Sequence, residues 1–207
     1  MSIDTALVRP AAATETTAVS RLLTDAFLAG PLAEHLVGDV AQRQRITAAY
    51  WSMIVEHAQH STTSAHIDVI GQADAAAIWY PTPAGQTPDL VPDDYDQRLA
   101  DAAGPHLHRF RALDELMHTV IPQIDTGWAY LGFVGVWPSA QDRGLGSTLL
   151  QRYHRTLDNN HTPAFLVASS GRSRQLYLRL GYRDHGAPLH VTDGVLMYPM
   201  LRTPHAA

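Results

Sequence analysis

The segment 128–137 is almost wholly apolar or glycine, and it ends at Pro138. A run of this kind without polar alternation is typical of a β-strand buried on both faces of a sheet. The next residues are Gln141-Asp142-Arg143-Gly144-Leu145-Gly146-Ser147, and leucines then recur at helical spacing over 144–157. The sequence therefore predicts a central strand, a glycine-containing turn and a helix in direct succession.

This turn has the features of a phosphate-binding site. The first N–H groups of a helix lack partners and lie at the positive end of the helix dipole. Gly144 and Gly146 would let an anion approach the backbone without a Cβ in the way, and Arg143 adds a positive charge. A helix start that merely contains two glycines is the alternative. The dinucleotide fingerprint lacks its third glycine here, and the Gly-Lys-Ser/Thr of a P-loop is absent.

The remaining elements follow from periodicity and from turn residues. Strands are expected at 6–9, 65–70, 75–80 and 164–168, with helices after the first strand, from near Asp39, and at 173–180. Residues 81–126 predict an insert of loop and helices, at 93–103 and 107–121. Asp193-Gly194 predicts a hairpin of strands at 185–191 and 195–201. The expected fold class is α/β (α+β), a mixed, largely antiparallel sheet flanked by helices.

The composition excludes several classes of function. The chain has no cysteine, so disulfides and thiolate catalysis are excluded. The formal charge of −5 comes without a basic stripe, and nucleic acid is not an expected partner. The 12 histidines are scattered without metal-ligand spacing, so no metal is expected. With neither a secretion signal nor a run of about 20 apolar residues, a cytoplasmic protein with no membrane partner is expected.

The segment Gln141-x-x-Gly144-x-Gly146, directly after Val134-Gly135-Val136-Trp137-Pro138, resembles the central motif of the GNAT superfamily of acyl-CoA-dependent N-acyltransferases. Residues 163–166, Ser169-Ser170 and 176–182 are similar to the next strand, helix and Gly-aromatic step of that family. The resemblance implies one domain over 1–207, a V-shaped splay between the two central strands, and acetyl-CoA as co-substrate. It also implies a monomer or homodimer.

Within the superfamily, Ala77-Ile78-Trp79 and Pro81-Thr82-Pro83 are similar to the puromycin N-acetyltransferase-type group of small-molecule acetyltransferases. This resemblance implies transfer of an acetyl group to a primary amine of a small molecule, antibiotic-like or aminonucleoside-like, and a role in antibiotic resistance. Two other functions stay open: acetylation of a protein N-terminus or lysine, and a non-catalytic fold that binds acyl-CoA.

The resemblance also assigns cofactor-binding residues. The backbone of Val134, Gly135 and Val136 would bond the pantetheine arm as an added strand, and an N–H in this segment would polarise the thioester carbonyl. The pyrophosphate and its surroundings would be held by Gln141, Asp142, Arg143, Gly144, Leu145, Gly146, Ser147 and Ser170. Asp142 departs from the family pattern, in which glycine or a basic residue is common. Its carboxylate is therefore expected to face away from the phosphates.

Tyr177 matches the family position of a general acid for the leaving thiolate, although a core tyrosine is the alternative. Residues 130–133 offer no carboxylate, so a general base would come from elsewhere, and Glu34 is the candidate. His35 would border the acceptor pocket together with Trp79, Tyr80 and Trp128. The alternatives are an ordinary helix-surface pair for Glu34 and His35, and core packing for the aromatic residues.

Overall fold

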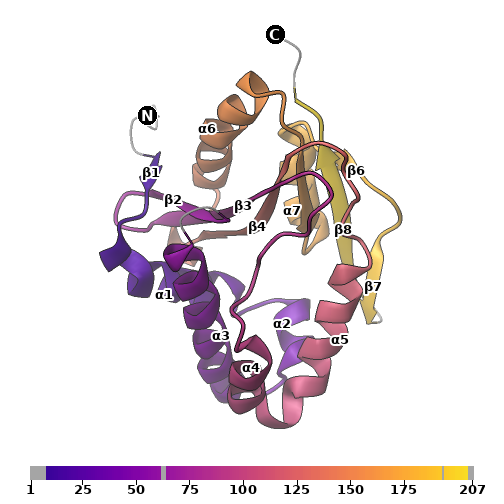
Figure 1. Cartoon of the computed structure of the whole chain (residues 1–207). Helices are drawn as coiled ribbons and strands as arrows, with labels where there is room; N and C mark the ends of the chain where they lie inside the picture. The colour runs from indigo at the N-terminus through magenta and orange to yellow at the C-terminus, as the bar shows by residue number, and fades with distance from the viewer. Residues whose placement is uncertain (1–7, 62–63, 193, 205–207) are drawn as a thin grey trace.

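In the computed structural model, which describes residues 8–61, 64–192 and 194–204, one mixed sheet crosses the molecule (Figure 1). Its strands are β1 (Val8–Pro10), β2 (His66–Ile70), β3 (Ala75–Thr82), β4 (Trp128–Val136), β5 (Ala164–Ala168), β6 (Arg183–Asp184), β7 (Leu189–Thr192) and β8 (Val195–Arg202). Their order is β1-β2-β3-β4-β5-β8-β6, and β7 pairs with β8. Among these described strands, only β4 and β5 pair in parallel. The predicted mixed, largely antiparallel sheet is confirmed.

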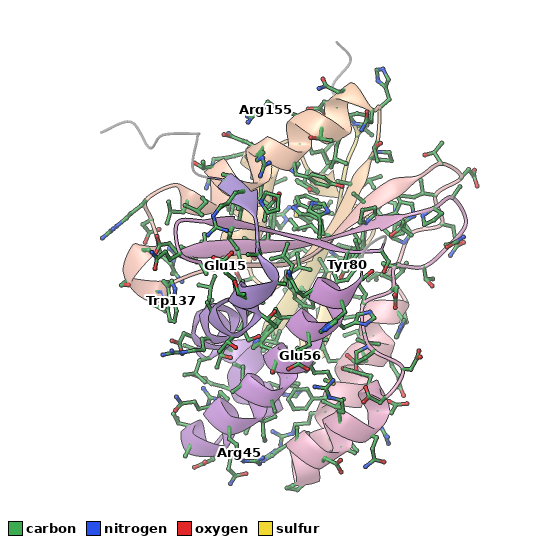
Figure 2. The ribbon with its side chains drawn as sticks, turned by 60° about the vertical axis from the view of Figure 1, so that its left-hand side comes forward. Glu15, Arg45, Glu56, Tyr80, Trp137 and Arg155 are labelled. Carbon is green, nitrogen blue, oxygen red and sulfur yellow. The ribbon has the colours of Figure 1, made fainter. Side chains whose placement is uncertain are left out.

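Helices cover both faces of the sheet. The α-helices of the described residues are α1 (Thr16–Phe27), α2 (Pro31–Leu36), α3 (Val40–His60), α4 (Tyr95–Ala103), α5 (Leu107–His118), α6 (Leu145–Asn159) and α7 (Gly171–Arg179). One core cluster packs α1 and α3 against the sheet, and a second packs α6 and α7 against the other face. Figure 2 shows this arrangement, with Arg155 on α6 and Glu56 on α3 on opposite sides of the strands.

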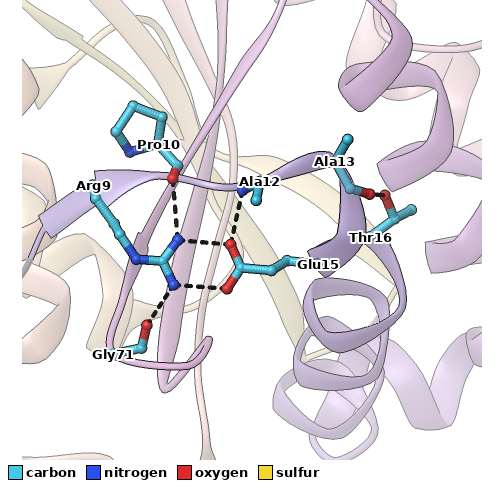
Figure 3. Close-up of polar contacts among 7 residues, drawn as sticks. All are labelled: Arg9, Pro10, Ala12, Ala13, Glu15, Thr16 and Gly71. Atoms are coloured by element: carbon cyan, nitrogen blue, oxygen red, sulfur yellow. Dashed lines mark hydrogen bonds and ion pairs between the residues drawn. The ribbon is translucent and has the colours of Figure 1, made fainter.

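The first strand and the first helix are joined by an ion pair (Figure 3). The guanidinium of Arg9 donates to both carboxylate oxygens of Glu15, at 2.6 and 2.7 Å, and to the carbonyl oxygen of Gly71 at 2.8 Å. Glu15 also accepts from the N–H of Ala12. The Arg9 hydrogen bond, helped by that of Ala12, lowers the pKa of the Glu15 carboxyl to about 2. This network fixes how the chain turns from β1 towards α1.

Most elements lie close to their predicted places, and the helix expected near Asp39 begins at Val40, with Asp39 as its N-cap. The sequence prediction missed α2, because Gly30-Pro31 indicates a break. Pro31 instead lies in the first turn of α2, where a missing N–H costs little. None of the helices in the described ranges is long and apolar enough to cross a membrane.

Several strand boundaries differ from the prediction. β3 continues through Pro81 to Thr82, because β2 pairs only as far as Trp79 and the missing N–H of Pro81 faces an open edge. The expected strand at 185–191 is replaced by β7 and the separate two-residue strand β6, both paired with β8. Asp193 of the hairpin turn, and residues 6 and 7 of the first predicted strand, lie outside the described residues.

β4 carries one residue more than β3 at a β-bulge. Leu131 is opposite Trp79 and Phe133 is opposite Ile78, so Gly132 has no partner residue. Gly132 lies against the fully buried ring of Tyr80, and a Cβ added to it would lie 2.6 Å from Tyr80 Cε2. A side chain at this position would therefore overlap the ring.

Gly132→Ala is expected to lower the free energy of unfolding by roughly 1–3 kcal/mol, the usual cost of overpacking a core. Urea denaturation measures this. Gly38→Ala is the matched control, since a Cβ at Gly38 would meet no atom within 4 Å. Equal stability of the two variants would contradict the close approach of Gly132 to Tyr80.

Candidate active site

The central feature of the site is an opening between β4 and β5. The two strands pair only at Ala129 with Ala164 and at Tyr130 with Phe165. Beyond these residues β4 stays paired with β3 as far as Val136, while β5 stays paired with β8 as far as Ala168. The two strands thus separate into a V, which confirms the predicted splay.

Beyond the V, β4 presents backbone groups to the opening. The N–H of Trp137 donates to the carbonyl oxygen of Asp74 at 3.1 Å, on the β3 side. In an antiparallel pair the neighbouring residue, Val136, must then direct its own N–H and C=O to the other edge. The side-chain amide of Gln141 donates to this carbonyl of Val136 at 3.3 Å, in agreement with that direction. By the alternation of a strand, Val134 faces the same way.

The bulge at Gly132 sets this alternation. Before it, the N–H of Ala129 donates to the carbonyl of Pro163 at 2.9 Å, so odd-numbered residues face β5. After it, the even-numbered residues Val134 and Val136 face the opening. Because of the one extra residue, the backbone groups that point away from β3 belong to odd-numbered residues before the bulge and to even-numbered residues after it. This change occurs where β4 and β5 part.

The predicted phosphate loop connects β4 to α6. It passes through a short 3-10 turn (Pro138–Ala140) and two residues with positive φ, Asp142 at 63° and Gly144 at 82°. The first helical hydrogen bond of α6 runs from Thr148 N–H to the Gly144 carbonyl, at 3.0 Å. The N–H groups of Leu145, Gly146 and Ser147 precede this bond, so helix geometry leaves them without helical partners. They can face an anion at the end of the opening.

The charges around this loop are partly neutralised. Asp142 Oδ1 accepts from Nη2 of Arg172, two residues into α7, at 2.6 Å, so the carboxylate is directed towards α7. Both side chains are largely exposed, at 82% and 72%. Arg143 is exposed as well. The sequence analysis missed Arg172, although its place two residues after Ser170, at a helix start, is the kind of position where an anion-binding arginine can lie.

Gly146 and Ser170 have different surroundings. A Cβ on Gly146 would be 3.8 Å from Leu176 and 3.9 Å from Val136, which are ordinary contacts, so protein packing alone does not require glycine there. Ser170 is the N-cap of α7, and its Oγ accepts from the N–H of Ser173 at 3.1 Å. The side chain of Ser170 therefore already has a structural role, at the start of the helix that carries Tyr177.

Tyr177 lies on α7 and is 9% exposed. Its ring centroid is 5.7 Å from that of Tyr182. Burial raises the pKa of the Tyr177 phenol, so the group keeps its proton at neutral pH. The phenol also raises the pKa of Tyr130, which burial has already raised, and Tyr130 forms the last residue pair before the V. Tyr177 therefore interacts with Tyr130, the residue after which β4 and β5 part.

The predicted acceptor residues do not gather in one place. Glu34 is exposed on α2. His35 is half-buried, and its carbonyl accepts from Arg109 of α5 at 2.6 Å, which ties α2 to α5. Trp79 packs on the α6 face, 4.6 Å from the ring of Tyr153, whereas Tyr80 belongs to the cluster under α1 and α3. Adjacent strand residues face opposite sides, so Trp79 and Tyr80 cannot line one pocket.

Four buried aromatic residues carry polar atoms without hydrogen-bond partners in the described structure: Trp51 Nε1, Trp79 Nε1, Tyr80 Oη and Trp128 Nε1. Trp128 is 2% exposed and packs with Tyr80 in the core under α1 and α3. Among the described residues, no group of three or more histidine, aspartate or glutamate side chains is placed to hold a metal ion.

Similar folds occur in solved structures. A Corynebacterium glutamicum protein described as histone acetyltransferase HPA2 and related acetyltransferase superposes with a TM-score of 0.70, at 23% identity over 97% of each chain. The ribosomal-protein-S18-alanine N-acetyltransferase of Escherichia coli gives 0.53, at 15% identity over 97% of this chain and 94% of that one. A mosquito arylalkylamine N-acetyltransferase (like 5b) gives 0.55, at 14% identity over 95% and 99%.

These likenesses establish the fold, and the sequence supplies the family. Residues 88–203 match the family described as acetyltransferase (GNAT) domain, and this match covers more than half of the chain. It includes β4, the loop with Gly144 and Gly146, and α7 with Tyr177. The chain is therefore a member of the GNAT family of acyl-CoA-dependent acetyltransferases.

Proposed function

We propose that the chain transfers an acetyl group from acetyl-CoA to a primary amine of a small molecule, by direct attack in a ternary complex. The observation that carries the proposal is the released edge of β4, which leads directly into the anion-binding start of α6. A pantetheine arm needs backbone partners along its amides, and the diphosphate at its end needs N–H donors and positive charge. The opening between β4 and β5 offers both in the right order.

Acetyl-CoA supplies the activated acetyl group as a thioester, which the amine attacks. The N–H groups of Val134 and Val136 are directed at the opening and can polarise the carbonyl as hydrogen-bond donors. The N–H groups of Leu145, Gly146 and Ser147, with Arg143, would hold the diphosphate. The phenol of Tyr177 would give its proton to the departing sulfur, which needs a donor that stays protonated at neutral pH.

A small amine is the acceptor we favour. We also propose that residues 1–207 form one domain. The support is the cluster of aromatic side chains under α1 and α3, where Trp51 packs edge-on against Phe133 of β4, with ring centroids 4.8 Å apart. Likeness to the puromycin N-acetyltransferase-type group favours an aminonucleoside or antibiotic-like molecule. A protein N-terminus or lysine is the second candidate, since one structural neighbour is a ribosomal-protein-S18-alanine N-acetyltransferase.

An acceptor panel tests this choice. With acetyl-CoA present, we expect thiol release with arylalkylamines and aminonucleosides, and none with peptides or whole proteins. The chain contains no lysine, so acetyl-lysine detected in added protein cannot come from the enzyme itself. Acetylation of peptides or proteins alone would refute the small-molecule acceptor, and no thiol release with any amine would refute catalysis.

Gly144→Val is expected to abolish binding of acetyl-CoA, because a β-branched residue cannot keep a φ of 82° and the loop would refold. Gly186→Val is the matched control, with a φ of 83° and open space around it. In a thermal scan, acetyl-CoA at a hundredfold excess over Kd should stabilise wild type and the control by about 2.7 kcal/mol. The same stabilisation of Gly144→Val would refute the loop assignment.

Tyr177→Phe removes one oxygen and keeps the ring. It should lower kcat on the order of a hundredfold, the lower end for loss of a general acid, while the affinity for acetyl-CoA stays near wild type. Tyr153→Phe, on α6 outside the opening, should retain wild-type kcat. Steady-state kinetics and a binding titration separate the two effects. A Tyr177→Phe enzyme with wild-type kcat would show that another donor protonates the sulfur.

A further inference from the structure

Asp114 is a half-buried carboxylate on α5. Its Oδ2 accepts a hydrogen bond from Tyr95 Oη, at the start of α4, at 2.8 Å. One helical turn before Asp114, Phe110 lies with its ring centroid 6.2 Å from that of Tyr50 on α3. Burial raises the pKa of the Tyr50 phenol, and the charge of Asp114 raises it further. The phenol and the carboxylate therefore interact electrostatically. The carboxylate thus lies among aromatic side chains.

Asp114 differs from the carboxylates of the described residues that are paired with arginine. These pairs are Glu15–Arg9, Glu56–Arg98, Asp94–Arg98, Asp68–Arg152, Asp142–Arg172, Asp158–Arg202 and Asp184–Arg174. Within the described ranges, no arginine or histidine nitrogen lies within 4.0 Å of Asp114. Arg98 of the adjacent helix α4 is held by Glu56 at 2.9 Å.

Two other titratable groups interact electrostatically with Asp114 from a greater distance. They are His118, one turn further along α5, and Asp96, in the first turn of α4. Burial is the largest cause that raises the pKa of Asp114, and the hydrogen bond from Tyr95 opposes it. A carboxylate that loses water without gaining a cation costs free energy. A cationic ligand would remove this cost.

The aromatic surroundings of Asp114 continue to the opening. The ring of Tyr50 lies 5.1 Å from that of Trp51, and the ring of Trp51 lies 4.8 Å from that of Phe133 on β4. Trp51 is 5% exposed, and its Nε1 has no hydrogen-bond partner in the described structure. Aromatic faces attract cations, and flat apolar groups pack on them. The phosphate loop belongs to the opposite face, with α6 and α7, so acceptor and cofactor would reach the opening from opposite sides.

We infer that Asp114 binds a positively charged group of the acceptor, with Tyr95 orienting the carboxylate and the rings of Tyr50 and Phe110 beside it. The inference rests on the proposed function, because it places the acceptor on the α1 and α3 face of the sheet. It narrows the substrate class to cationic amines that carry an aromatic or other flat apolar part. The residue selects the acceptor and is distinct from the groups that act on the thioester.

Binding of two unreactive probes tests this selection without needing turnover. One probe is an arylalkyl trimethylammonium ion, and the other is its uncharged analogue, in which carbon replaces the nitrogen. Calorimetry with the protein saturated with CoA should show that wild type prefers the cation by about tenfold or more, the scale of a desolvated charge pair with aromatic contacts. Asp114→Asn, which can still accept from Tyr95, should reduce the preference to roughly one- to threefold.

Glu115→Gln is the matched control, because Glu115 is the next residue on α5 and is exposed. It should keep the wild-type preference. Tyr95→Phe removes only the orienting hydroxyl and should lower the preference for the cation to a value between those of wild type and Asp114→Asn. It replaces Asp114→Asn as the test variant if Asp114→Asn does not fold. Equal or absent binding of the probes by wild type, or an unchanged preference in Asp114→Asn, would overturn the inference. Because this experiment measures binding and the acceptor panel measures acetyl transfer, a failure of the inference and a failure of the proposed function can be told apart.

Discussion

The parting of β4 from β5 after Tyr130 and Phe165 is the constraint on which the rest of the site depends. Interior strands of a sheet normally satisfy both edges, and each buried backbone group left unpaired is costly. Here the sheet stays continuous on either side, because β3 and β8 hold the outer edges of the two strands. The cost is thus confined to one short edge, which an extended ligand with amides of its own can complete.

Two local features make this edge usable. The bulge at Gly132 turns the N–H groups of Val134 and Val136 to the opening, and it needs glycine because the ring of Tyr80 occupies the space of a side chain. The positive φ of Gly144 then turns the chain into α6 just where β4 ends. Asp142 also has a positive φ, which aspartate tolerates better than most residues, and its pairing with Arg172 offsets its charge next to the proposed diphosphate site.

Local patterns were sufficient to predict the parts of the fold that depend on neighbours in sequence. A few neighbouring residues were enough to predict four features: the apolar run of β4, the glycines of the loop, the leucine spacing of α6 and the hairpin around Gly194. The acceptor side depends on packing between distant segments, and there the residue prediction was less informative. The period-2 alternation already implies that Trp79 and Tyr80 face opposite sides, but which side faces which helix emerges only from tertiary packing.

Asp114 is a second residue whose surroundings could not be predicted from the sequence. In sequence it is one of two acidic residues on an amphipathic helix, and such a residue is usually a solvated surface charge. Its character comes from α3 and α4, which bring Tyr50 and Tyr95 to it and hold Arg98 elsewhere. The same helix α5 braces α2 through Arg109. In the proposed function, the segment between β3 and β4 would therefore both support the acceptor side and supply a charge that selects the acceptor, while β4, α6 and α7 would hold the acyl donor.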